Sequence, residues 1–240
     1  MQLGTVETRY SKKFSYIKDT DEAVHLENYG EYKQKEINLL ALLLSNNVGD
    51  TFVYDVGAGI GTRTVALSKM AAVIAFEHDE DKLKVLKMNT QGKIAPNVMI
   101  VPKSLETTDP HAKDIPNLDG QLMQLPEPTL VCISGDSTRV LRGMTATMML
   151  IKPVIYIDIA NTEDISYQYS ILVERGYKMY WYSCPGFNLN NFKEKQLNIT
   201  ADSFYMNILA IHEDVDIHDG GIDLPRIDGP NDNWKRFNND

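Results

Sequence analysis

The stretch DVGAGIGT, residues 55–62, decides the fold of this 240-residue chain. It follows a run of β-branched and aromatic residues, Thr51 to Val56, that predicts a buried strand, and Thr62 to Met70 behind it predicts a helix. Glycines here let the chain turn sharply and bring bare backbone against a ligand, with amide groups of the helix directed at it. Because ligands of open α/β sheets bind beyond the carboxyl ends of the strands, this turn is the first candidate for a binding site.

Two details around the turn narrow the choice of ligand. The spacing is G-x-G-x-G with Asp55 ahead of it, whereas the dinucleotide fingerprint G-x-G-x-x-G needs Gly or Ala at the position of Thr62. Glu77 ends the next predicted strand, about twenty residues on, where a carboxylate can bind a ribose diol. An acid beside the turn repels a pyrophosphate but suits an ammonium and a sulfonium, namely S-adenosylmethionine; a purely structural turn with a chance Glu is the alternative. The residues expected to hold this cofactor around the turn are Asp55, Gly57, Ala58, Gly59, Gly61, Thr62, Glu77 and His78.

Predicted strands and helices alternate along the rest of the chain, which indicates an α/β fold with a mostly parallel sheet and helices on both faces. The last two predicted strands have no helix between them, so we expect them to pair antiparallel at one edge. The proline-rich stretch 102–128 is expected to be irregular, with at most a short helix. Predicted helices cover 31–47, 62–70, 81–91, 137–150 and 164–175, and predicted strands cover 51–56, 72–76, 98–101, 129–133, 153–159, 177–182 and 204–211.

One domain is expected over residues 31–212, after a short N-terminal extension, 1–30, and before an acidic tail, 213–240. The tail holds eight acidic and three basic residues, a net charge of 3 − 8 = −5. We expect it to be solvated and partly disordered, with docking through Trp234 and Phe237 as the alternative.

The composition argues against several classes of protein. Lys and Arg total 24 and Asp and Glu total 33, a net charge of −9, which is poorly suited to gripping a nucleic acid. Two cysteines are too few for a disulfide framework or a four-thiolate zinc site, so a reducing compartment is expected. The N-terminus has no apolar segment of the secretory kind, and apolar runs such as Leu39 to Leu44 are far shorter than the roughly 20 residues that span a bilayer. We therefore expect a cytoplasmic protein with neither a membrane nor a nucleic-acid partner.

The histidines show no metal-binding spacing, so no metal site is predicted, although a magnesium site of scattered carboxylates stays open.

The segments VYDVGAGIGTRTVALSKM and VIAFEHDEDKLKVLKMN resemble motifs I and II of the FkbM-type S-adenosylmethionine-dependent methyltransferases. Upstream, ENYGEYKQKEINLL is similar to the segment before motif I; downstream, KPVIYIDI, ERGYKMYWYSCPGFNLNNF and MNILAI are similar to the end of that domain. The resemblance covers residues 25–213. It implies the class I methyltransferase (Rossmann-like) fold, a seven-stranded sheet with the last strand reversed, and O-methylation, commonly of sugars or small metabolites.

The chain departs from the family's pattern at the end of the fourth predicted strand. Relatives usually carry Asp-x-Glu-Gly there, whereas this chain has the shorter run Ile133-Ser134-Gly135-Asp136, which keeps one acid. Either Asp136 takes over the work of that stretch or the chemistry is impaired. Ser134, in the same segment, is counted with the cofactor-binding residues.

Methyl transfer depends mainly on holding the reactants in line, and an alcohol nucleophile also benefits from a base. Asp136 is the first candidate for that base, with the N-cap of the helix starting near Ser137 as the alternative. Asp158, at the end of the fifth predicted strand, is the second, with helix capping as its alternative. Asn161, just beyond Asp158, is a candidate for substrate contact.

Three further places could line the site. Glu31 can reach the methionine ammonium, unless it is an ordinary first-turn Glu favoured by the helix dipole. Ser104 can line the adenine pocket, unless it is a plain loop serine. The loop after the sixth predicted strand pairs aromatic rings with amides, a combination suited to a sugar, although the rings of Phe187 and Phe192 could equally plug the core. The expected substrate residues of this loop are Phe187, Asn188 and Asn191.

The sequence thus favours an S-adenosylmethionine-dependent O-methyltransferase acting on a sugar or another small hydroxyl compound. A nicotinamide oxidoreductase is the rival within the enzymes. A non-catalytic or structural protein that keeps the cofactor-binding fold is the alternative outside them, and methylation of RNA or DNA comes last. The oligomeric state is not predicted.

Overall fold

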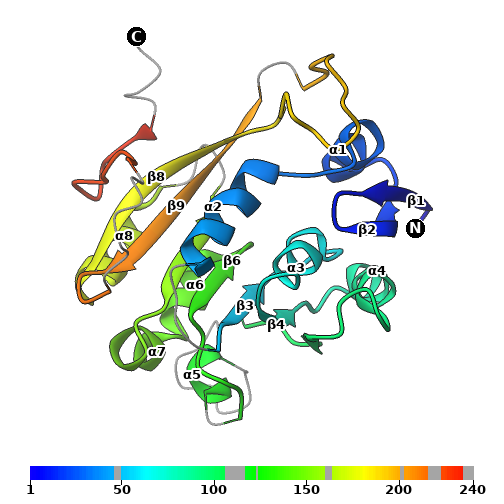
Figure 1. Cartoon of the computed structure of the whole chain (residues 1–240). Coiled ribbons are helices and arrows are strands. Elements are labelled where there is room, and N and C mark those ends of the chain that lie inside the picture. Colours follow the sequence, from blue (N-terminus) through cyan, green and yellow to red (C-terminus); the bar gives the residue numbers. More distant parts are fainter. Residues whose placement is uncertain are drawn as a thin grey trace. The chain divides into compact units, whose positions relative to one another are not determined.

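The computed structural model describes residues 1–45, 50–105, 117–122, 124–159, 164–200, 203–215 and 223–234. The chain forms two compact units, residues 1–103 with 184–204 (unit 1) and residues 104–183 with 205–240 (unit 2). A seven-stranded sheet has the strand order β5-β4-β3-β6-β7-β9-β8. The strands β1 and β2 form a separate two-stranded sheet (Figure 1). The pairs β3–β4, β4–β5 and β6–β7 are parallel and β7–β9 is antiparallel, which confirms the predicted mostly parallel sheet.

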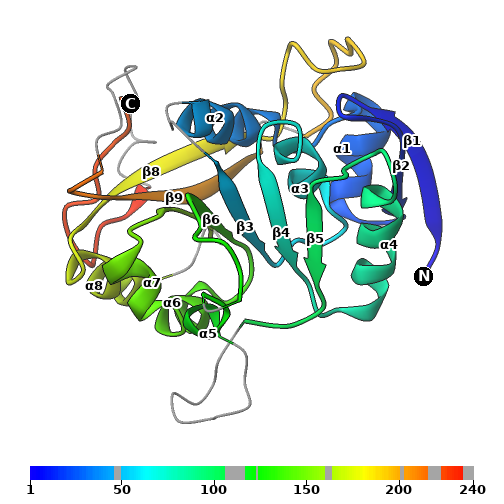
Figure 2. The same ribbon diagram turned by 60° about the horizontal axis from the view of Figure 1, so that its bottom comes forward.

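In unit 1 the predicted strands are confirmed almost residue for residue. β3, β4 and β5 lie side by side (Figure 2), and β3 and β4 are buried along nearly their whole length. Parallel strands buried on both faces need unbroken apolar runs, which is why the sequence marked them so clearly. The elements of unit 1 are β1 (Leu3–Thr8), β2 (Ser11–Ile17), α1 (Asp21–Tyr29), α2 (Gln34–Ser45), β3 (Phe52–Val56), α3 (Thr62–Leu67), β4 (Ala72–Phe76), α4 (Glu80–Thr90) and β5 (Val98–Val101).

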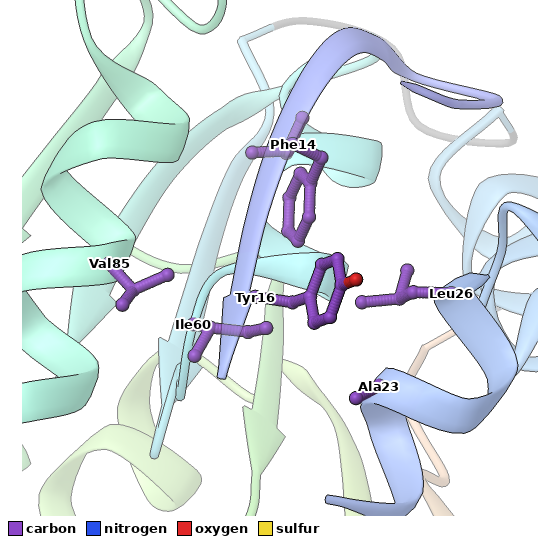
Figure 3. Close-up of a cluster of buried hydrophobic side chains, with 7 residues drawn as sticks. Phe14, Tyr16, Ala23, Leu26, Ile60 and Val85 are labelled. Atoms are coloured by element: carbon purple, nitrogen blue, oxygen red, sulfur yellow. The ribbon is translucent and has the colours of Figure 1, made fainter. Parts of the chain in front are cut away.

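Residues 1–30, for which the sequence indicated no element, fold into the β1–β2 hairpin and α1. Figure 3 shows Phe14 and Tyr16 of β2 facing Leu26 of α1 and Ile60 of the glycine turn in one buried cluster. Asn89 of α4 extends this contact, because its amide donates to the carbonyls of both Ser15 and Ile60 at 2.8 Å. The N-terminal segment therefore packs directly on the glycine turn.

Unit 2 contains the second half of the predicted alternation. The strands β6 and β7 are almost wholly buried, and β9 pairs with β7. The elements of unit 2 are α5 (Leu118–Gln121), β6 (Leu130–Ile133), α6 (Ser137–Arg142), α7 (Thr145–Leu150), β7 (Val154–Asp158), α8 (Ser166–Val173), β8 (Tyr177–Pro185, whose last two residues belong to unit 1) and β9 (Phe204–His212, with Phe204 in unit 1).

The predicted single helix over 137–150 is wrong, because the structure has two helices there, α6 and α7. The N–H of Gly143 closes the end of α6 on the carbonyls of Arg139 and Val140. Asp119 of α5 then caps the start of α7 by accepting hydrogen bonds from the backbone N–H groups of Ala146 and Thr147 at 2.9 and 2.8 Å. In a continuous helix these two N–H groups would donate to backbone carbonyls one turn earlier. Because Asp119 accepts from them instead, a second helix begins here.

Part of the tail packs against β8, whereas we expected the tail to be solvated and partly disordered. The N–H of Trp181 in β8 donates to the carbonyl of Pro225 at 2.8 Å, and the N–H of Ile227 donates to Met179 at 2.9 Å. Ile227 is only 2% exposed, so an apolar side chain anchors this part of the tail. Phe237 lies outside the described residues. Among the described helices, none combines the length and the apolar character needed to cross a membrane.

Candidate functional site

The glycine turn after β3 has the backbone conformation that only glycine adopts freely. Gly57, Gly59 and Gly61 have φ angles of 74°, 59° and 91°, all in the left-handed region. The N–H groups of Gly57 and Ala58 both donate to the carbonyl of Phe76, each at 3.0 Å. The turn is therefore fastened to the end of β4.

Glu77 fastens the turn a second time. Its side chain is 4% exposed, and its Oε2 accepts a hydrogen bond from the N–H of Gly59 at 2.8 Å. Its Oε1 accepts from the N–H groups of His78 and Asp79, also at 2.8 Å. A carboxylate has about four acceptor positions, so Oε2 can accept one more bond from a ligand. His78 itself is exposed.

The turn leaves open space on one side. A Cβ atom added to Gly59 would meet no heavy atom within 4 Å, whereas a Cβ on Gly61 would lie 2.6 Å from Cδ1 of Leu86. Gly61 is thus needed for close packing on α4, and Gly59 borders space that a ligand can enter.

Asp55, at the end of β3, is fully buried and held by α3. Its Oδ1 accepts from Nε and Nη2 of Arg63 at 2.9 and 2.8 Å, and its Oδ2 accepts from the hydroxyl of Thr64 at 2.6 Å. Nη1 of Arg63 also donates to Glu36 of α2 at 3.1 Å. Asp55 therefore orients α3 behind the turn, and its predicted contact with the cofactor's ammonium stays a prediction. Nothing near DVGAGIGT in the sequence had marked Glu36 as a partner.

Thr62, the first residue of α3, donates its hydroxyl hydrogen bond to Glu22 of α1. Burial raises the pKa of Glu22, and the Thr62 hydroxyl and the charges of Lys33 and Lys82 act in the opposite direction. Glu22 was not a predicted site residue, because a helical Glu some forty positions upstream gives no signal of contact with the turn.

Glu31 is 6% exposed and joins the hairpin to the loop after β8. Its Oε2 accepts from Nε and Nη2 of Arg9 at 3.0 and 2.8 Å and from the N–H of Phe192 at 2.9 Å. Its Oε1 accepts from the amide of Asn188 at 2.6 Å. The structure thus gives Glu31 four donors from the protein itself, and its contact with the cofactor stays a prediction.

The predicted substrate residues of this loop hold the loop together. The amide of Asn191 donates to the carbonyls of Asn188 and Lys195 at 2.9 and 2.6 Å, and its oxygen accepts from the N–H of Lys195 at 3.0 Å. The ring of Phe187 packs on Tyr29, with centroids 5.4 Å apart. This geometry supports the structural reading of Phe187 and Asn191, and their contact with a sugar stays a prediction.

Two predicted residues of unit 2 meet at the carboxyl ends of the parallel strands β6 and β7. The hydroxyl of Ser134 donates to Oδ2 of Asp158 at 2.5 Å, and both side chains are half-buried. Asp136 instead caps α6, because it accepts from the N–H of Arg139 and pairs with its Nε, both at 3.1 Å. Ser104, after β5, is half-buried. Asn161 lies outside the described residues.

Sequence reasoning missed Asn207 of β9. This residue is fully buried and is the Cα partner of Asp158 in the β7–β9 pair. Its amide donates to the carbonyls of Tyr205 and Tyr182 at 3.0 and 3.4 Å. A polar residue inside the apolar run MNILAI was the signal that could have found it.

No group of three or more His, Cys, Asp or Glu side chains in the described ranges is arranged to hold a metal ion.

Comparison with known proteins bears on the fold. The sequence matches no protein-family model and no curated protein. A precorrin-6Y C5,15-methyltransferase from Geobacter metallireducens has a similar structure, with a TM-score of 0.53 and 16% identity over 76% of this chain and 95% of that chain. The chain has the class I methyltransferase fold. An S-adenosylmethionine-dependent O-methyltransferase from Thermotoga maritima is similar too, with a TM-score of 0.53 and 14% identity over 89% of this chain and 79% of that one.

The FkbM methyltransferase of Methylobacillus flagellatus matches more weakly. Its TM-score is 0.42 at 16% identity, over 67% of this chain and 43% of that chain. A similarity this low does not assign the chain to the FkbM family, so that resemblance stays a prediction.

Proposed function

We propose that this chain transfers a methyl group from S-adenosylmethionine to a hydroxyl group of a sugar or another small molecule. The observation that carries the proposal is the glycine turn, where Gly59 borders open space while its N–H is held by Glu77. The fold supports the proposal by analogy, since the two similar structures above are methyltransferases by name.

The residues around the turn fit this cofactor. Bare backbone at Gly59 leaves room for a ligand, and Oε2 of Glu77 can accept one more hydrogen bond, from a hydroxyl of a ribose. Asp55 is buried and paired with Arg63, so its contact with the ammonium of the methionine part stays a prediction. When bound, the cofactor supplies an electrophilic methyl group on a sulfonium.

Asp158 is the better supported base. Its carboxylate is fixed by the Ser134 hydroxyl at a strand end, where ligands of α/β sheets bind, so it can take the proton of an acceptor hydroxyl. Asp136 has its carboxylate engaged in the cap of α6 and the pair with Arg139.

Calorimetry and methyl transfer test the proposal together. Purified protein should bind S-adenosylhomocysteine in the micromolar range, and it should transfer labelled methyl groups from S-adenosylmethionine to a component of a glycan extract. Binding of NAD without binding of S-adenosylhomocysteine would favour the oxidoreductase instead. Asp158→Asn should abolish transfer while the cofactor still binds, and Asp136→Asn is its matched control. Loss of transfer in Asp136→Asn alone would return the role of base to Asp136.

A non-catalytic protein with the same fold is the second candidate. It is favoured by the use of Asp136 as a helix cap, because the FkbM-type enzymes that the sequence resembles usually carry two acids in this segment. Tight binding of S-adenosylhomocysteine without transfer to any acceptor would support this candidate.

A further inference from the structure

Asn207 has a satisfied donor group and an unsatisfied acceptor. Its amide nitrogen donates to the carbonyls of Tyr205 and Tyr182, at 3.0 and 3.4 Å. Because both partners are acceptors, the nitrogen must face them, which fixes the orientation of the amide. Its Oδ1 is buried and accepts no hydrogen bond from the part of the chain that the structure describes. A buried acceptor in this state is usually completed by a ligand, an ion or a water molecule.

The register of the sheet places this acceptor beside the candidate base. Asn207 and Asp158 are direct Cα partners in the antiparallel pair of β9 and β7. Side chains of directly opposite residues project from the same face, with Cβ atoms about 5 Å apart. Asp158 in turn receives the hydroxyl of Ser134 at 2.5 Å. A carboxylate and an amide oxygen therefore occupy neighbouring positions at the carboxyl end of β7.

Two neighbouring acceptors select a ligand that presents two neighbouring donors. Building on the proposed function, we propose that Asp158 and Asn207 bind a methyl acceptor with two adjacent hydroxyl groups, a vicinal diol. The first hydroxyl gives its proton to Asp158 while its oxygen forms the bond to the methyl carbon; the carbon–sulfur bond breaks and its electron pair stays on sulfur. The second hydroxyl donates to Oδ1 of Asn207 and so fixes which oxygen is methylated. An amide oxygen carries no charge, so this second position favours a neutral hydroxyl over an ammonium.

The test compares a diol with analogues that lack the adjacent pair. The probes are methyl α-D-mannopyranoside and its 3-deoxy and 2,4-dideoxy analogues, which have no two adjacent hydroxyls, with labelled S-adenosylmethionine. The wild type should use the diol with a kcat/KM at least about tenfold above either analogue, the effect of one hydrogen bond. Asn207→Leu should lower the rate on the diol to the level of the analogues.

A matched control and a readout independent of turnover separate this role from a structural one. The amide of Asn97 also donates to two backbone carbonyls, those of Ser68 and Ala71 at 2.8 and 2.6 Å, so Asn97→Leu loses the same kind of bonds elsewhere. It should keep the preference for the diol. In NMR spectra, the side-chain amide signal that Asn207→Leu removes should shift with the diol and not with the analogues.

Several results would overturn the inference. They are equal rates of the wild type on diol and analogues, a preference for the diol that survives in Asn207→Leu, and labelling of a glycan extract without labelling of the diol. Absence of S-adenosylhomocysteine binding contradicts the proposed function instead. A shift of the Asn207 amide signal by the diol in such a protein would leave the diol site standing.

Discussion

Gly59→Ala separates binding at the glycine turn from stability of the fold. Gly59 has a φ angle of 59°, and a Cβ atom there would meet no heavy atom within 4 Å. The only cost to the fold is the left-handed backbone of an alanine, about 1–2 kcal/mol in the free energy of unfolding. The new methyl group occupies the space that the ligand needs, so the affinity for S-adenosylhomocysteine should fall at least about tenfold, or about 1.4 kcal/mol.

The chain supplies two matched controls for this variant. Gly92 has a φ angle of 64° and equally open surroundings, but it follows α4 and lies outside the turn. Gly92→Ala should cost the same stability and leave the affinity unchanged. Gly61→Ala adds a collision at 2.6 Å with Leu86, so overpacking should raise its cost to about 2–4 kcal/mol. Urea unfolding and calorimetry give the two quantities. Equal affinities of Gly59→Ala and Gly92→Ala would refute a ligand on this turn.

Three further predictions concern polar groups in the two units. Glu31→Gln removes the charge that holds Arg9, Asn188 and the N–H of Phe192, so the free energy of unfolding in urea should fall by about 2 kcal/mol; a loss too small to measure would contradict the assigned role. Asn89→Leu should destabilise the protein by about 1–3 kcal/mol more than Asn207→Leu. The reason is that the side-chain oxygen of Asn89 accepts a hydrogen bond from the N–H of Ser15, while that of Asn207 is unsatisfied among the described residues. Equal losses of unfolding free energy would argue that the Asn207 oxygen has a partner. Burial lowers the pKa of His25, so the unfolded chain binds the proton more readily, and stability should fall as the pH drops below about 6.5; thermal unfolding between pH 7.5 and 5.5 should show this fall, and His25→Gln should flatten it.

The parallel strands of unit 1 could be predicted because each is a short run of apolar residues in the sequence. Ala72–Phe76 and Val98–Val101 have the predicted bounds, since both are short apolar runs closed by turn or loop residues. The glycine turn was equally readable, because its three left-handed positions admit glycine at no steric cost.

The hairpin β1–β2 could not be found in this way. Its turn, around Arg9 and Tyr10, contains no Asn-Gly or Asp-Gly signal, and its buried face is completed by Leu26 and Ile60 from elsewhere in the chain. The break between α6 and α7 was missed for a similar reason. Asp119 caps α7 from 27 positions away, and the local pattern does not contain that contact.

The candidate site was predictable in its residues but not in their partners. Glu31 and Asn188 were assigned to different ligands, yet they bond to each other across 157 positions of sequence. Asp158 was recognised from its place at a strand end, whereas Asn207 became a candidate only when the sheet register placed it opposite Asp158. Spacing shows which residue types are present, and long-range pairing decides which of them meet.

The most direct test of the account is a crystal structure of the protein with S-adenosylhomocysteine. We predict electron density for the ligand along the backbone of residues 57–61, with a ribose hydroxyl bonded to Oε2 of Glu77. Density for the ligand at any other place, or a turn that stays bare at saturating ligand, would contradict it.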